Sequence, residues 1–178
     1  MNVYIDLGSH VGKTIAMFMR SKQYSPDFQI HAFEASPTVP ARYPQGVIVH
    51  KVAAWIFDGT IKFYTNPKKI KTQCASVFRR KTSGHLDKKH PLLVPCVDFS
   101  KWITENFKET DNIIVKADIE GAEYPVFTKM MEDNTIGYIK KLYMDERHWD
   151  RIGMQEIEDR VFINRLRKAT EVHDDYKF

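Results

Sequence analysis

The sequence predicts an α/β fold in which a mostly parallel sheet carries helices on its faces. Two observations carry this prediction. Short apolar runs alternate with stretches of helical periodicity, which is typical of parallel sheets. Acidic residues follow four of these apolar runs, where right-handed crossovers bring strand ends together. The chain has 178 residues, 43% of them hydrophobic, so we expect a single domain over residues 1–178.

The first half of the chain begins with an apolar run and a glycine. Val3–Leu7 is expected to form a buried strand that ends before Gly8. Residues 12–21 read as a helix because their apolar side chains recur at helical spacing. Two further strands are expected at residues 29–33 and 47–52.

The middle of the chain departs from this alternation. Residues 60–64 alternate as a strand does, and residues 65–91 form a long polar excursion. Another strand is expected at 92–97, where Pro95 favours an edge position because proline has no N–H for the sheet. Residues 99–107 suit a helix.

The last part returns to regular alternation. The expected elements are a strand at 112–117, a helix at 121–131, a strand at 139–144, an amphipathic helix at 154–169 and a short strand at 171–176.

Composition excludes several classes of protein. Cys74 and Cys96 are the two cysteines, too few for a disulfide scaffold or a cysteine-rich zinc module. No apolar run is long enough to span a membrane, and the N-terminus lacks a signal-peptide pattern. We therefore expect a soluble, cytoplasmic protein without membrane insertion. The net charge of +4 is too small to indicate nucleic-acid binding by itself.

Four predicted strands end in acidic residues. These are Asp6, Glu34, Asp118 and the pair Asp145–Glu146. Each could simply cap a following helix, which is the ordinary use of such a carboxylate. Capping explains the set of four less well, because all four ends are expected to face one crevice.

A glycine pair follows the first strand. Gly8 permits a turn with positive φ, and Gly12 is expected to let the helix start pack close to the sheet. Glu34 ends the next strand, where a carboxylate can accept hydrogen bonds from both hydroxyls of a ribose. This combination favours a nucleoside cofactor.

Two competing cofactor sites fit less well. A phosphate-binding P-loop needs four residues between its glycines, and Gly8 and Gly12 enclose three. A dinucleotide site needs glycine where His10 stands, so that the backbone can approach a pyrophosphate. A cofactor with a ribose and no phosphate, such as S-adenosylmethionine, fits better.

Several segments together resemble the FkbM family of S-adenosylmethionine-dependent methyltransferases. They are Tyr4–Gly12, His31–Pro37, Val52–Trp55 with Asp58–Tyr64, Val115–Glu123 and Leu142–His148, of which Val115–Glu123 is the most specific. The resemblance implies a class I methyltransferase fold, a Rossmann-like three-layer sandwich, and O-methylation of sugars or sugar-decorated metabolites. The cofactor-binding residues it implies are Asp6, Gly8, Ser9, His10, Gly12, Glu34, Ala35 and Ala53.

Asp118 is the leading candidate for the general base, because a sugar hydroxyl must lose a proton to become a nucleophile. The alternatives are that it binds the cofactor's ammonium or caps a helix. His148 and Glu146 follow the next strand and are further catalytic candidates. Asp118 with Asp145 or Glu146 could hold Mg²⁺ or Ca²⁺, but carboxylates alone do not indicate a metal, and none is predicted.

The excursion at 65–91 is the expected acceptor-binding element. It is rich in basic residues, among them Lys68, Lys69, Lys71, Arg79, Arg80, Lys81, Lys88 and Lys89. Phe63, Tyr64 and Phe78 could offer faces on which a sugar stacks. The ordinary alternative is a solvated loop. We expect a sugar or glycan acceptor, with RNA, a small metabolite or a non-catalytic binding role as alternatives, and leave the oligomeric state open, a homodimer included.

Overall fold

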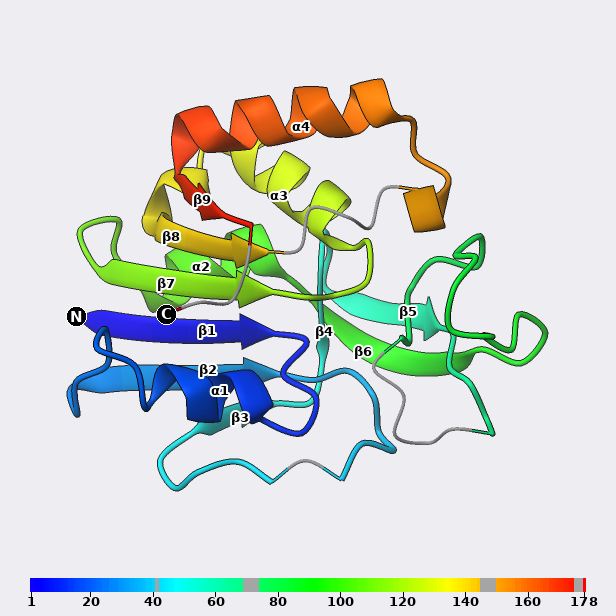
Figure 1. The fold of residues 1–178 in the computed structure, drawn as a ribbon, viewed down its shortest axis with the longest axis horizontal. Helices are drawn as coiled ribbons and strands as arrows, with labels where there is room; N and C mark the ends of the chain where they lie inside the picture. The colour runs from blue at the N-terminus through cyan, green and yellow to red at the C-terminus, as the bar shows by residue number, and fades with distance from the viewer. Residues whose placement is uncertain (41, 69–73, 145–149, 175–177) are drawn as a thin grey trace.

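A computed structural model describes residues 1–40, 42–68, 74–144, 150–174 and 178 (Figure 1). Its main sheet has six strands: β1 (Asn2–Leu7), β2 (Phe28–Phe33), β3 (Ile48–His50), β7 (Asn112–Ala117), β8 (Ile139–Met144) and β9 (Glu171–His173). They lie in the order β3-β2-β1-β7-β8-β9, and every pairing is parallel. The predicted α/β fold with a mostly parallel sheet is confirmed.

Helices cover both faces of this sheet. They are α1 (Lys13–Phe18), α2 (Phe99–Asn106), α3 (Glu123–Glu132) and α4 (Glu156–Ala169), with 3-10 turns η1 (Ile136–Tyr138) and η2 (Asp150–Ile152). Ile15 and Phe18 of α1 pack with Tyr4 on one face. Helices α2, α3 and α4 share a core with the other face. The fold is therefore a three-layer sandwich.

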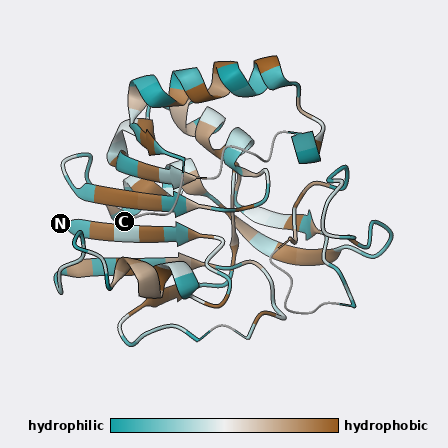
Figure 2. Ribbon diagram, viewed as in Figure 1, coloured by the Kyte–Doolittle hydropathy of each residue, from teal (hydrophilic) through white to brown (hydrophobic). Residues whose placement is uncertain are grey.

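The strand order places a switch point beside β1. The chain leaves β1 for β2 and β3 on one side, and later enters β7, β8 and β9 on the other. The two central strands, β1 and β7, are apolar along most of their length, as Figure 2 shows. A parallel strand that helices cover on both faces has no face exposed to solvent. The carboxyl ends of β1, β2 and β7 consequently meet at one edge of the sheet.

A second sheet of three strands lies beyond those carboxyl ends. It consists of β4 (Ala53–Trp55), β6 (Leu92–Asp98) and β5 (Gly59–Phe63), in that order, and Figure 1 places it to the side of the main sheet. The strand expected at 47–52 is present as the shorter β3 of the large sheet. Strand β4 of the small sheet, which follows after Lys51 and Val52, was not expected.

The edge position expected from Pro95 is wrong, because β6 is the middle strand of the small sheet. Pro95 pairs across from Thr60 of β5, whereas β4 pairs only with Cys96–Asp98. The proline is thus tolerated because the ladder with β4 starts after it.

The other elements overlap the expected ranges, with ends that differ by a few residues. The helix expected at 12–21 is limited to α1. The strand expected at 171–176 is present as β9, and residues 175 and 176 of that range lie outside the described part of the chain. Part of the excursion is tied down by a bridge between Tyr64 and Ser76. Among the described residues, no helix is both long and apolar enough to cross a bilayer.

Candidate active site

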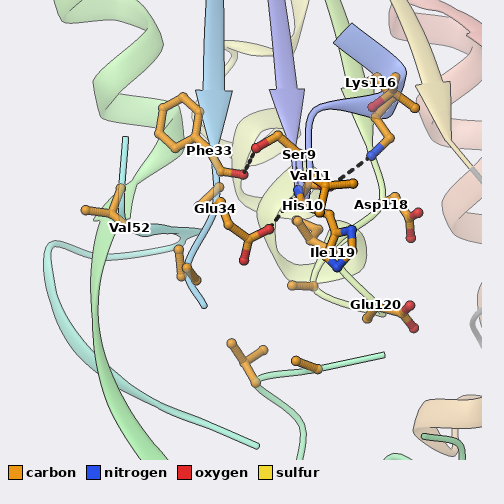
Figure 3. A pocket seen from close by; sticks show the side chains of 18 of the residues that line it. Ser9, His10, Val11, Phe33, Glu34, Val52, Lys116, Asp118, Ile119 and Glu120 are labelled. Atoms are coloured by element: carbon orange, nitrogen blue, oxygen red, sulfur yellow. Dashed lines mark hydrogen bonds between the residues drawn. The ribbon is translucent and has the colours of Figure 1, made fainter. Parts of the chain in front are cut away.

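A cavity of about 330 Å³ opens at the carboxyl ends of β1, β2 and β7 (Figure 3). Four segments meet there: the β1–α1 loop, the residues after β2, the loop after β7, and a wall from the small sheet and the excursion. The last wall is apolar and consists of Val52, Ala53, Ala54, Phe63, Ala75 and Val77. The crevice expected at the switch point is present.

The β1–α1 loop depends on Gly8. Its φ is +76°, and a Cβ on this residue would lie 2.1 Å from the carbonyl oxygen of Asp118. The backbone N–H groups of Gly8 and Ser9 both donate to the carbonyl of Phe33, at 3.0 Å each. Gly8 therefore lets three strand ends approach one another, as a side chain there would push the loop after β7 away.

Gly12 serves a different purpose from the expected one. Its φ is +80°, and its close neighbour is the ring of Tyr43, 2.9 Å from the place a Cβ would take, rather than the sheet. The Tyr43 hydroxyl donates to the carbonyl of His10 at 3.0 Å and lies 2.7 Å from Ser9 Oγ. Tyr43, which the sequence did not reveal, thus braces the loop from outside.

Glu34 lines the cavity, and backbone amides fix its carboxylate. Oε2 accepts from His10 N–H at 2.8 Å (Figure 3), and Oε1 accepts from Ser36 N–H at 2.7 Å. Burial raises the pKa of the Glu34 carboxyl, and these two hydrogen bonds oppose the increase. Each carboxylate oxygen can accept a further hydrogen bond, so this oriented group can also receive two donors from a ligand.

His10 is the least satisfied polar side chain of the lining. Its φ is +46°, and neither ring nitrogen has a hydrogen-bond partner within the described structure. An imidazole has one donor and one acceptor in its neutral form, so a ligand in the cavity could satisfy both.

Asp6 lies beneath the cavity and is not among its lining residues. Its carboxylate lies 3.0 Å from Lys116 Nζ and accepts from the Thr14 hydroxyl. Lys116 also donates to the carbonyl of Gly8 at 3.1 Å. Lys116 and Thr14 both line the cavity, so Asp6 positions two lining residues.

The loop after β7 places Asp118 beside β1, as expected. Its N–H donates to the carbonyl of Leu7 at 3.0 Å, and the half-buried residue lines the cavity. Glu123 holds the loop that follows, because its carboxylate accepts from Ile119 N–H at 2.6 Å and Gly121 N–H at 2.7 Å. Asp118 therefore lies at a fixed backbone position.

The excursion is fastened to this loop through Glu120. Lys81 is 1% exposed, and its ammonium lies 2.5 Å from the Glu120 carboxylate. The Ser76 hydroxyl donates to the carbonyl of Glu120 at 2.9 Å. Lys81, counted from the sequence among the basic residues of the excursion, is thus an internal anchor and cannot contact a ligand at the surface.

The expected residues fall into three groups. Gly8, Ser9, His10, Glu34, Ala35, Ala53 and Phe63 line the cavity, while Gly12, Tyr64 and Phe78 are not among its described lining. Asp145, Glu146 and His148 lie outside the described residues, as do Lys69 and Lys71. In the described ranges, no three His, Cys, Asp or Glu side chains group as metal ligands do.

Comparison with known protein families gives one match. The model of the methyltransferase FkbM domain matches residues 6–167. Neither the curated proteins nor the solved structures include a match to the chain. The matched range contains every strand end that borders the cavity. The chain therefore belongs to the FkbM methyltransferase family, and its cavity lies at the switch point of a Rossmann-like fold.

Proposed function

We propose that this chain is an S-adenosylmethionine-dependent O-methyltransferase that acts on a hydroxyl of a sugar or glycan. Family membership supports methyl transfer. The observation that carries the choice of cofactor is the Glu34 carboxylate, oriented by two backbone amides at the cavity. A ribose diol offers two donors to such a carboxylate, which is the use dinucleotide folds make of this position.

The rest of the cavity fits a nucleoside cofactor without phosphates. The apolar wall formed by Val52, Ala53 and Ala54 suits a purine ring, which needs contact area more than charge. His10 occupies the position where a pyrophosphate site would need glycine. Its two ring nitrogens have no hydrogen-bond partner within the described structure and can bind a polar group of the ligand. Gly8 and Ser9 offer bare backbone beside Glu34.

Asp118 is the proposed general base. When bound, S-adenosylmethionine supplies an electrophilic methyl carbon. Asp118 accepts the proton of the acceptor hydroxyl as the oxygen–methyl bond forms, so the products are a methyl ether, S-adenosylhomocysteine and a protonated carboxyl group that returns its proton to water. Fixed placement at the end of β7 serves this step, because proton transfer requires hydrogen-bond distance to the hydroxyl.

A cofactor-binding experiment tests the first half of the proposal. We expect calorimetry to detect S-adenosylhomocysteine binding with one site per chain. NAD⁺ and Mg-ATP should bind at least about tenfold more weakly, because the loop lacks the glycine and the extra residue that their phosphates require. Tighter binding of Mg-ATP than of S-adenosylhomocysteine would refute the assignment.

The acceptor class needs a separate experiment. Transfer of tritiated methyl from S-adenosylmethionine should label glycans or free sugars and leave RNA unlabelled. Labelling that resists base and is lost from acceptors without free hydroxyls would identify O-methylation. Labelling of RNA alone would overturn the sugar assignment, and no labelling with intact cofactor binding would favour a binding module.

A further inference from the structure

The outer face of α4 is more apolar than its neighbours require. Phe162, Ile163 and Leu166 pack inward against the core shared with α3. On the opposite side, Ile157 and Val161 are 62% and 53% exposed and stand one turn apart. Exposed aliphatic residues at this spacing form a continuous stripe.

A shallow groove runs along this stripe. Its lining is Thr128 of α3 with Met154, Ile157, Glu158, Val161, Phe162 and Arg165. In Figure 1, α4 forms an outer edge of the molecule, and no residue of α4 lines the active-site cavity. The groove is therefore a surface separate from the catalytic one.

Charge is distributed unevenly along the helix. Glu156 and Glu158 lie in the first turn, whereas Arg165 and Lys168 lie toward the end. Glu158 and Arg165 stand seven residues apart, on the same flank of the stripe and on opposite sides of Val161 along the helix. A partner helix with the same sequence would be complementary in the antiparallel direction and repulsive in the parallel one.

We propose that α4 is the contact surface of a homodimer in which two copies pack antiparallel about a two-fold axis at Val161. Val161 then meets its counterpart, and Ile157 packs against the aliphatic stem of Arg165 of the second copy. Glu158 faces that same arginine, so each copy contributes one charge to two equivalent ion pairs at the rim. Self-complementarity of this kind is what a two-fold interface requires.

The size of the surface predicts a weak dimer. A helix of 14 residues is about 21 Å long, so one helix per subunit gives an interface at the small end of the known range. We expect the full chain to sediment as a monomer–dimer equilibrium with dissociation in the micromolar range. Sedimentation as a monomer alone at concentrations well above that range would overturn the proposal.

An apolar substitution locates the interface. Val161→Glu places a charge at the two-fold axis and should weaken dimerisation at least about tenfold, because both copies then bury like charges. Leu93→Glu is the matched control, since Leu93 is 71% exposed on β6 of the three-stranded sheet, away from α4. Equal effects of the two variants, or a larger effect of Leu93→Glu, would refute an α4 interface.

Charge reversal tests the direction of packing. Glu158→Arg and Arg165→Glu should each weaken association about tenfold through like-charge contacts, and the double variant should return to within about threefold of the wild type. Glu158 also accepts from Gln155 N–H at the helix start, a cap that both variants of Glu158 lose. Restored association in the double variant therefore reports the pairing and not the cap. Glu105→Arg on α2 is the control for exposed charge, and failure of the double variant to recover would contradict antiparallel packing.

Discussion

The two walls of the cavity are built in different ways. On the side where we propose that the cofactor binds, Gly8, Glu34 and the ends of β1 and β2 are held by hydrogen bonds to backbone groups within a few residues of each strand. On the excursion side, Ala75 and Val77 belong to a segment fastened by Ser76 and by Lys81 to Glu120. The first wall is therefore held by backbone hydrogen bonds close to the strands, whereas the second depends on a backbone bridge between Tyr64 and Ser76 and on a few side-chain contacts.

This difference suits a division of labour. A cofactor common to a whole family needs one fixed shape, which strand ends provide. An acceptor that differs between enzymes is better contacted by a loop, because loops change without disturbing the sheet. The buried pair Lys81–Glu120 joins the two, since Glu120 lies two residues from Asp118. Changes to each wall should accordingly have separable effects.

The largest effect is expected from Asp118→Asn, in the loop where the walls meet. The amide keeps the shape of the carboxylate and cannot accept the hydroxyl proton, so kcat should fall about 10²–10⁴-fold. Binding of S-adenosylhomocysteine should stay within about tenfold. Methyl transfer to the identified acceptor and a thermal-shift measurement check this.

Asp58→Asn is the matched control, because Asp58 is an exposed carboxylate bonded to Lys101 and lies outside the cavity lining. Near-normal kcat in folded Asp118→Asn would remove the base assignment. Loss of cofactor affinity alone would instead give Asp118 a binding role.

Lys81→Met should produce the next largest effect. The substitution removes the ammonium group that Glu120 contacts, and the loss of one partner from a buried ion pair typically destabilises a protein by about 3–5 kcal/mol. Urea denaturation measures this loss. Lys101→Met breaks the exposed pair with Asp58 and should have a much smaller effect on stability, because water screens that pair.

The double variant Lys81→Met/Glu120→Gln tests the cause of that loss. Removing both charges should restore much of the stability lost by Lys81→Met alone. A double variant that is less stable than Lys81→Met would show that the lysine stabilises through packing and not through its charge. In either case the acceptor KM should rise, because the excursion loses its ion pair with Glu120 and keeps the hydrogen bond from Ser76.

A pair of glycine substitutions compares a close backbone approach with an open turn. Gly8→Ala meets the carbonyl of Asp118, whereas Gly46 has a similar φ of +88° and nothing within 4 Å of its missing Cβ. Positive φ costs both alanines about 1 kcal/mol, and Gly8→Ala should cost at least about 2 kcal/mol more. Equal destabilisation would mean that the loop after β7 can move aside freely.

Acid should lower the free energy of unfolding through the buried side chain of His31 on β2. Burial beside His50 lowers the pKa of His31 from 6.5 to about 4, and the two rings share a hydrogen bond of 2.9 Å. Between pH 6.5 and 4, His31 is protonated in the unfolded chain and neutral in the folded chain. The free energy of unfolding is therefore highest above pH 6.5 and decreases as the pH falls toward 4. We expect a loss of about 2 kcal/mol, from roughly 1.4 kcal/mol per pKa unit with allowance for partial exposure. His31→Phe should flatten the slope of stability against pH, and an unchanged slope would contradict this origin.

The sequence predicted the cavity lining at the strand ends better than it predicted the excursion. Gly8, Glu34 and Asp118 follow from local rules, because strand ends and glycine turns are recorded in neighbouring residues. Lys81 and Glu120 are 39 residues apart, and nothing in a run of lysines marks the one that is buried. The sequence did not predict the role of Tyr43 or strand β4 for the same reason, since both depend on contacts between distant segments.

The division between the walls is tested most directly by calorimetry with S-adenosylhomocysteine on two variants. Glu34→Ala removes the carboxylate that we propose accepts hydrogen bonds from the ribose hydroxyls. Binding should weaken by about 1–3 kcal/mol, the range for hydrogen bonds to a charged group. Lys81→Met alters the other wall and should leave the dissociation constant within about threefold of the wild type. Unchanged affinity in Glu34→Ala, or an equal loss in both variants, would contradict a cofactor wall that is built and acts separately from the excursion.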